Sequence, residues 1–81
     1  MKPKLTYFYT NECPKCQELK PVIKEIEQLF EVVYINTHEN EILTESNNVL
    51  WVPTFMLEDQ NGKHKIEGIK EITKFLKELV L

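Results

Sequence analysis

The 81-residue chain contains no arginine, only two cysteines and only two glycines. Its ten cations are all lysines, and thirteen acidic residues outnumber them, so the net charge is −3. Nucleic-acid-binding domains carry basic patches that neutralise phosphates, so this composition does not predict nucleic-acid binding. No apolar run approaches the roughly 20 residues that a helix needs to cross a bilayer, and we therefore expect no membrane association.

Two cysteines are too few for the disulfide framework that holds small secreted domains together. The ring that Cys13 and Cys16 would close is so short that loop entropy gives it only about 2 kcal/mol. No small-residue cleavage site follows the first lysines, so we expect no secretory signal and take the cytoplasm as the compartment. The apolar content of 42% is typical of a folded globule, and we expect one domain over residues 1–81. We also expect the protein to be a monomer.

Strand and helix patterns alternate along the chain. The predicted order is a strand at 4–9, a helix at 14–30, a strand at 32–35, a helix at 38–47, strands at 54–57 and 63–66, and a last helix striped by apolar residues from Ile69 to Val80. Asn61-Gly62 predicts a hairpin turn between the last two strands, because this pair tolerates positive φ. The βαβαββα order predicts an α/β fold in which three helices flank a four-stranded mixed sheet.

Three local features refine this prediction. The continuously apolar stretch at 32–35 is typical of a strand buried on both faces. Pro14 suits a first helical turn, where its missing N–H costs nothing. Pro21 lies inside the same predicted helix, removes one backbone hydrogen bond and is expected to kink it.

The sequence Cys13-Pro14-Lys15-Cys16 lies between the first predicted strand and the first predicted helix. A thiol at the start of a helix faces unpaired backbone N–H groups and the positive end of the helix dipole, which favour the thiolate. Lys15 favours the Cys13 thiolate as well, whereas Glu12 opposes it. Because a thiolate is the nucleophile in disulfide exchange and a second thiol can resolve the mixed disulfide, the motif predicts a dithiol–disulfide exchanger.

A different class of function also fits a Cys-x-x-Cys pair. The two cysteines would supply half of a zinc site that His38 and His64 complete. These histidines lie 22 and 48 residues after Cys16, which matches no zinc-finger spacing. We therefore predict redox chemistry with no bound metal or cofactor, and keep a non-catalytic metal-binding or interaction module as the alternative.

Four features together resemble the thioredoxin superfamily, in particular its small thioredoxin-like and glutaredoxin-like members. They are Cys13-Pro14-Lys15-Cys16 after the first strand, Pro21 in the following helix, Val52-Pro53-Thr54 before the third strand, and Asn61-Gly62 with Gly68 around the final hairpin. The resemblance implies a protein-disulfide oxidoreductase in which Cys13 attacks and Cys16 resolves. It also implies disulfide-containing protein partners and a reductase or small thiol that recharges the pair.

The same resemblance assigns substrate-binding residues. Pro53 matches a proline that is cis in the family and faces the dithiol. The backbone N–H and C=O of Val52 would then pair with an extended substrate segment, and Gly68 would leave room for that segment because it has no Cβ. Trp51 precedes this bend, where a core position and a substrate contact are equally compatible with the sequence.

The chain departs from both branches of the superfamily. Thioredoxins carry a Trp just before the first cysteine, where this chain has Glu12, and a buried Asp at about the position of Tyr7. No carboxylate occurs from Lys2 to Thr10, so the sequence predicts no buried carboxylate that relays a proton for Cys16. Glutathione-using glutaredoxins carry a Lys shortly before the motif and a Gly-Gly or Gly-Cys-Asp segment at the last helix. Neither feature is found here, so the resemblance does not extend to a glutathione site.

Overall fold

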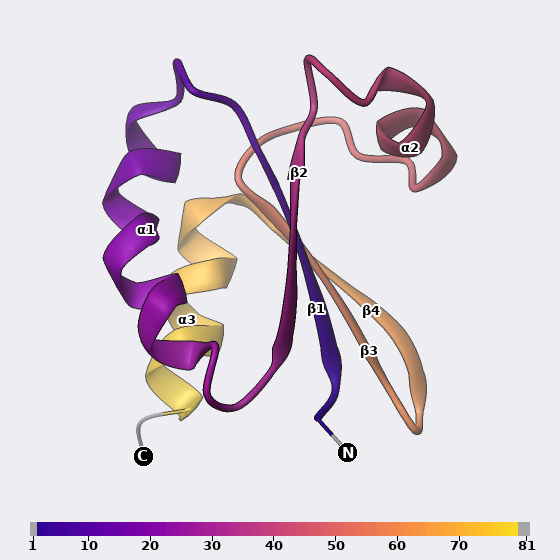
Figure 1. The fold of residues 1–81 in the computed structure, drawn as a ribbon. Coiled ribbons are helices and arrows are strands. Elements are labelled where there is room, and N and C mark those ends of the chain that lie inside the picture. Colours follow the sequence, from indigo (N-terminus) through magenta and orange to yellow (C-terminus); the bar gives the residue numbers. More distant parts are fainter. Residues whose placement is uncertain (1, 80–81) are drawn as a thin grey trace.

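The computed structural model describes residues 2–79 (Figure 1). Its elements are β1 (Lys4–Tyr9), α1 (Pro14–Ile26), β2 (Glu31–Asn36), α2 (Glu41–Ser46), β3 (Thr54–Asp59), β4 (Gly62–Glu67) and α3 (Gly68–Leu79). The four strands form one sheet in the order β2-β1-β3-β4. Strand β1 pairs parallel with β2 and antiparallel with β3, which in turn pairs antiparallel with β4. The predicted α/β fold is confirmed, while Val80 of the predicted last helix lies outside the described residues.

The main core lies between the sheet and the two longer helices. Helices α1 and α3 cover the same face of the sheet (Figure 1). Each fully buried large apolar side chain there contributes roughly 1.5–3 kcal/mol relative to exposure, so this layer is the main source of stability. Its buried members are Leu5, Tyr7, Cys16, Leu19, Ile23, Ile26, Phe30, Phe55 and Ile72.

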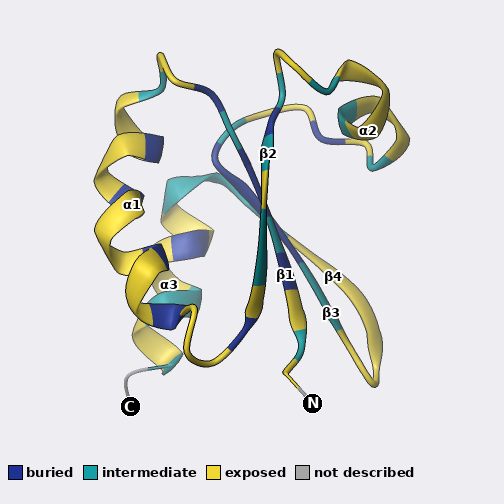
Figure 2. Ribbon diagram, viewed as in Figure 1, coloured by how far each residue is buried: buried dark blue, intermediate teal, exposed yellow. Residues whose placement is uncertain are grey.

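The opposite face of the sheet is less well covered. Because side chains alternate along a strand, Phe8 and Met56 point to this face, where they pack with Val49 in a second, smaller cluster. Helix α2 lies near this cluster but buries none of its own residues, and Figure 2 shows it mostly exposed. None of the helices within residues 2–79 is both long and apolar enough to cross a membrane.

Three sequence expectations differ from the structure. Strand β2 is not buried on both faces, since it lies at the sheet edge and Tyr34 is 43% exposed. Helix α1 ends at Ile26 rather than at residue 30, and the following turn leaves Leu29 exposed while Phe30 returns to the core. Helix α2 begins three residues later than expected, at Glu41, because residues 37–39 form a turn.

The hairpin turn forms where the sequence places it. Asp59 pairs with Gly62 across the antiparallel ladder, and its carboxylate accepts a hydrogen bond of 2.8 Å from the Asn61 N–H. Gly62 adopts φ +118°, a conformation that side chains disfavour. The turn thus brings β4 beside β3 and sends Gly68 back toward the end of the sheet where β1 meets α1.

Candidate active site

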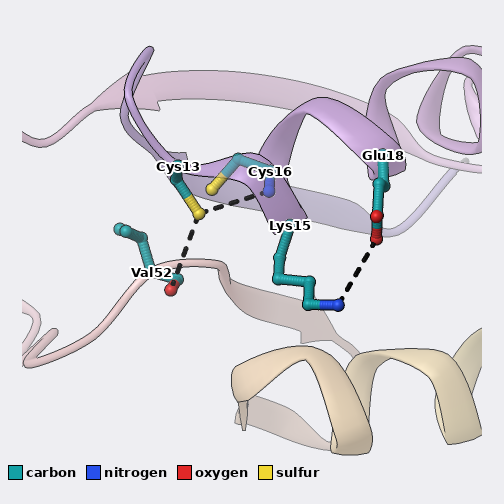
Figure 3. Close-up of polar contacts among 5 residues, drawn as sticks. All are labelled: Cys13, Lys15, Cys16, Glu18 and Val52. Carbon is teal, nitrogen blue, oxygen red and sulfur yellow. Dashed lines mark hydrogen bonds and ion pairs between the residues drawn. The ribbon is translucent and has the colours of Figure 1, made fainter.

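Cys13 caps the N-terminus of α1. Its backbone is extended, with φ −86° and ψ 111°, and Pro14 occupies the first helical turn as predicted. The Cys16 N–H donates a hydrogen bond of 3.2 Å to the Cys13 sulfur (Figure 3). The sulfur therefore lies where helix-end N–H groups stabilise negative charge.

The second thiol of the motif is enclosed by the main core. Cys16 is only 1% exposed, whereas Cys13 is half-buried, and both are free thiols. Removal from water is the main reason why the pKa of Cys16 is raised to about 11. The neighbouring Cys13 thiol acts in the same direction, while the Thr10 backbone and the Tyr7 side chain oppose the rise. The two cysteines thus differ in exposure, since Cys13 is partly accessible to solvent and Cys16 is enclosed in the core.

The loop before β3 supplies the facing wall of the site. The Val52–Pro53 peptide bond is cis, and the Val52 carbonyl oxygen lies 4.0 Å from the Cys13 sulfur (Figure 3). The Pro53 carbonyl oxygen accepts a 3.0 Å hydrogen bond from the Gly68 N–H. Three segments far apart in sequence, at Cys13, Val52 and Gly68, therefore meet at one end of the sheet.

Trp51 and Gly68 border this wall. Trp51 is 62% exposed, so it belongs to the surface rather than to the core. Its carbonyl oxygen accepts a 2.7 Å hydrogen bond from the Thr54 hydroxyl, which holds the loop against β3. A Cβ at Gly68 would meet no atom within 4 Å, so only its φ of +84° favours glycine at this position. The role of Gly68 in substrate binding stays a prediction.

The two charged residues beside the motif are paired with other groups. The Lys15 ammonium lies 3.8 Å from the Glu18 carboxylate, and Figure 3 shows the side chain extended toward Glu18. The Glu12 carboxylate lies 3.9 Å from the His38 imidazole. All four side chains are largely exposed, so these pairs are weak. The modulating roles of Glu12 and Lys15 stay predictions.

The histidines lie on the surface. His64 pairs with Asp59 over 3.6 Å on the hairpin, away from the dithiol. Within residues 2–79, no group of three or more His, Cys, Asp or Glu side chains is arranged to hold a metal ion.

Comparison with known proteins assigns a family. A family model described as Thioredoxin matches residues 1–80. The chain belongs to the thioredoxin family. A thioredoxin-like protein of Synechocystis is 26% identical over 83 residues, which cover 96% of this chain and 79% of that protein. Chloroplastic thioredoxin Y of Oryza sativa is 27% identical over 84 residues; the match covers 96% of this chain but only 49% of that longer protein.

Solved thioredoxin structures share the fold. The germline-specific thioredoxin Deadhead of Drosophila melanogaster superposes with a TM-score of 0.77 at 27% identity, over 96% of this chain and 81% of that one. A thioredoxin of Nicotiana alata superposes with a TM-score of 0.80 at 24% identity, over 96% of this chain and 71% of that one. Family and fold support a thioredoxin-like redox function, since members of this family act on protein disulfides and are recharged by reductases.

Tyr7 is a site residue that the sequence indicates only through its position, which the resemblance assigns to a different residue type. At the position where the resemblance implies a buried Asp, Tyr7 is 1% exposed, and its hydroxyl donates a 3.1 Å hydrogen bond to the Cys16 carbonyl oxygen. Strand alternation was the available signal, because it puts Tyr7 on the same face as Leu5, beneath α1. The position therefore holds a phenol against Cys16.

Proposed function

We propose that this chain is a thiol–disulfide oxidoreductase that reduces disulfide bonds in partner proteins. The observation that carries the proposal is the contrast between the two sulfurs. Cys13 is half-buried and its sulfur accepts a 3.2 Å hydrogen bond from the Cys16 N–H, while Cys16 is only 1% exposed. Such a pair suits one thiolate for attack on a large partner and reserves the other for an intramolecular step.

The reaction has two exchange steps. The Cys13 thiolate attacks one sulfur of the partner disulfide; a Cys13–partner bond forms, and the other partner sulfur leaves as a thiolate. Cys16 then gives its proton to solvent and attacks the Cys13 sulfur. The Cys13–Cys16 disulfide forms, the second partner sulfur leaves as a thiolate, and two electrons have passed from the dithiol to the partner.

The wall opposite Cys13 supports binding of an extended partner segment. The Val52 carbonyl oxygen lies 4.0 Å from the attacking sulfur, so a chain that reaches this sulfur passes along the Val52 backbone. Edge-type backbone pairing at such a site is independent of the partner's side chains, which fits a carrier with several partners. Exposed Trp51 supplies an apolar contact on one side, and the open space at Gly68 admits the segment on the other.

Recharging requires an external electron source, because the proposed reaction leaves the dithiol oxidised. A thioredoxin reductase and glutathione are the two routes that thioredoxin-like and glutaredoxin-like carriers would use. We favour the reductase, since the residues typical of a glutathione site are not found around the motif. We propose that the protein acts in the cytoplasm, because thiols are kept reduced there. We also propose that it acts as a monomer.

A coupled insulin-reduction assay tests the proposal. We expect insulin precipitation with NADPH and thioredoxin reductase, much slower turnover with glutathione and its reductase, and no activity from Cys13→Ser. Equal activity of the parent and Cys13→Ser would overturn the proposal. A stoichiometric metal in freshly purified protein would favour the metal-binding alternative instead.

A further inference from the structure

The ring of Tyr7 is held rigidly inside the main core. It stacks on Tyr9 with ring centroids 5.4 Å apart and forms a T-shaped contact with Phe55, with centroids 5.5 Å apart. With only 1% of the residue exposed, the hydroxyl must find its partner inside the protein, and it donates to the Cys16 carbonyl oxygen at 3.1 Å. This packing fixes the phenol at the base of the first turn of α1.

The surroundings of the Cys16 thiol hold few polar groups. Besides Cys13, they are the backbone of Thr10 and the Tyr7 hydroxyl, which donates a 3.1 Å hydrogen bond to the Cys16 carbonyl oxygen. The β3 and α3 members of the same cluster, Phe55 and Ile72, are apolar. No carboxylate occurs on β1. The Tyr7 hydroxyl is therefore a side-chain donor beside Cys16, while β1 supplies no carboxylate base.

We propose that the buried Tyr7 hydroxyl is a hydrogen-bond donor that stabilises the Cys16 thiolate as it attacks the Cys13–partner disulfide. This inference rests on the proposed function and describes its second step. In the resting protein the O–H bond points to the Cys16 carbonyl oxygen. In the proposed step the ring stays in place and the O–H bond rotates toward the Cys16 sulfur when that sulfur becomes charged.

The phenol acts as a donor and not as a proton acceptor. Burial raises the pKa of Tyr7 far above its ordinary value, and the neighbouring Cys16 thiol raises it further, so the hydroxyl stays protonated. The proton of Cys16 consequently goes to hydroxide or buffer in the solvent. The electron pair left on sulfur forms the Cys13–Cys16 bond, and the pair of the broken bond leaves with the partner sulfur.

Stopped-flow mixing with one equivalent of an aromatic nitrobenzoate disulfide separates the two steps. Attack by Cys13 releases the first coloured thiolate, and attack by Cys16 releases the second. Loss of one hydrogen bond to the Cys16 thiolate raises the pKa of this thiol by about one unit, which lowers the thiolate fraction about tenfold. A thiolate of higher pKa is more nucleophilic, and this recovers about threefold of the lost rate. We therefore expect Tyr7→Phe to slow the second phase about threefold near neutral pH, shift its pH profile upward by about one unit and leave the first phase unchanged.

Tyr34→Phe is the matched control, because it removes a hydroxyl that bonds the Glu27 carboxylate rather than the cysteines. Both of its phases are expected to match the parent. An unchanged second phase in Tyr7→Phe, or an equal slowing of both phases with no shift in the pH profile, would overturn the inference. If the parent itself shows no first phase, the proposed function fails, and the inference fails with it.

A second variant covers the case in which Tyr7→Phe does not fold. In a Tyr9→Phe, Tyr34→Phe background, fluorotyrosine enters only at Tyr7 and makes its hydroxyl a stronger donor. We expect a faster second phase than in the same background with ordinary tyrosine. An unchanged or slower second phase would count against the Tyr7 hydroxyl as the donor.

Discussion

Replacement of Cys13 separates two roles of one sulfur, the observed cap of α1 and the proposed nucleophile. Cys13→Ser keeps an atom that can accept the hydrogen bond which the Cys16 N–H donates at 3.2 Å, whereas Cys13→Ala removes the acceptor. We expect neither variant to reduce insulin. The alanine variant is expected to be less stable than the serine variant, although both lack the thiol.

The magnitude follows from the geometry of the helix start. Loss of a side-chain N-cap acceptor costs about 1 kcal/mol, within a range of about 0.5–2 kcal/mol. Helix α1 carries Leu19, Ile23 and Ile26 of the main core, so fraying of its first turn lowers the unfolding free energy of the whole domain. In a domain of this size, 1 kcal/mol corresponds to a fall in Tm of about 4–8 °C.

Urea denaturation of the reduced variants, followed by far-ultraviolet circular dichroism, measures the difference directly. Comparison of serine with alanine, rather than of either with cysteine, isolates the hydrogen bond from the loss of the larger sulfur. Equal unfolding free energies for the two variants would show that the sulfur does not cap the helix.

Three further predictions concern charge, packing and partner contact. Burial raises the pKa of Cys16 from 9.0 to about 11, so the unfolded chain releases this proton first as the pH rises. The unfolding free energy of the reduced protein is expected to fall by on the order of 2 kcal/mol between these two pH values. Urea titrations of Cys16→Ala are expected to show a smaller fall over the same pH range, and an equal fall in parent and variant would contradict this. Ile72 is fully buried and Ile42 is 82% exposed, so thermal melts are expected to show a loss of about 0.5–1.5 kcal/mol for Ile72→Val and almost none for Ile42→Val. Trp51→Ala is expected to lower kcat/KM for insulin about fivefold, equivalent to about 1 kcal/mol of lost contact, with unchanged stability; an unchanged kcat/KM would place Trp51 outside the partner surface.

The order of elements and the place of the dithiol could be predicted because they depend on local signals. Apolar spacing marks α1 and α3, and Pro14 with the adjacent Cys13 marks the helix start. Asn61-Gly62 marks the hairpin through a backbone preference of the glycine. These features act within a few residues of one another, so they can be recognised in a single sequence.

The remaining features depend on contacts between distant segments. Strand β2 was expected to be buried because its residues are apolar, but its exposure depends on its place at the sheet edge. The pairing of Lys15 with Glu18 and of Glu12 with His38 depends on which partners the fold brings near. The contact of Tyr7 with Cys16 likewise exists only once α1 lies on the sheet.

Trapping of the mixed disulfide tests the central claim most directly. Cys16→Ser is incubated with an insulin disulfide, and intact-mass analysis with peptide mapping identifies any linked species. We expect a stable complex joined through Cys13, released by a small thiol and not formed by Cys13→Ser. Failure of Cys16→Ser to capture insulin, or capture of insulin through Cys16 by Cys13→Ser, would contradict the assignment of Cys13 as the attacking thiol.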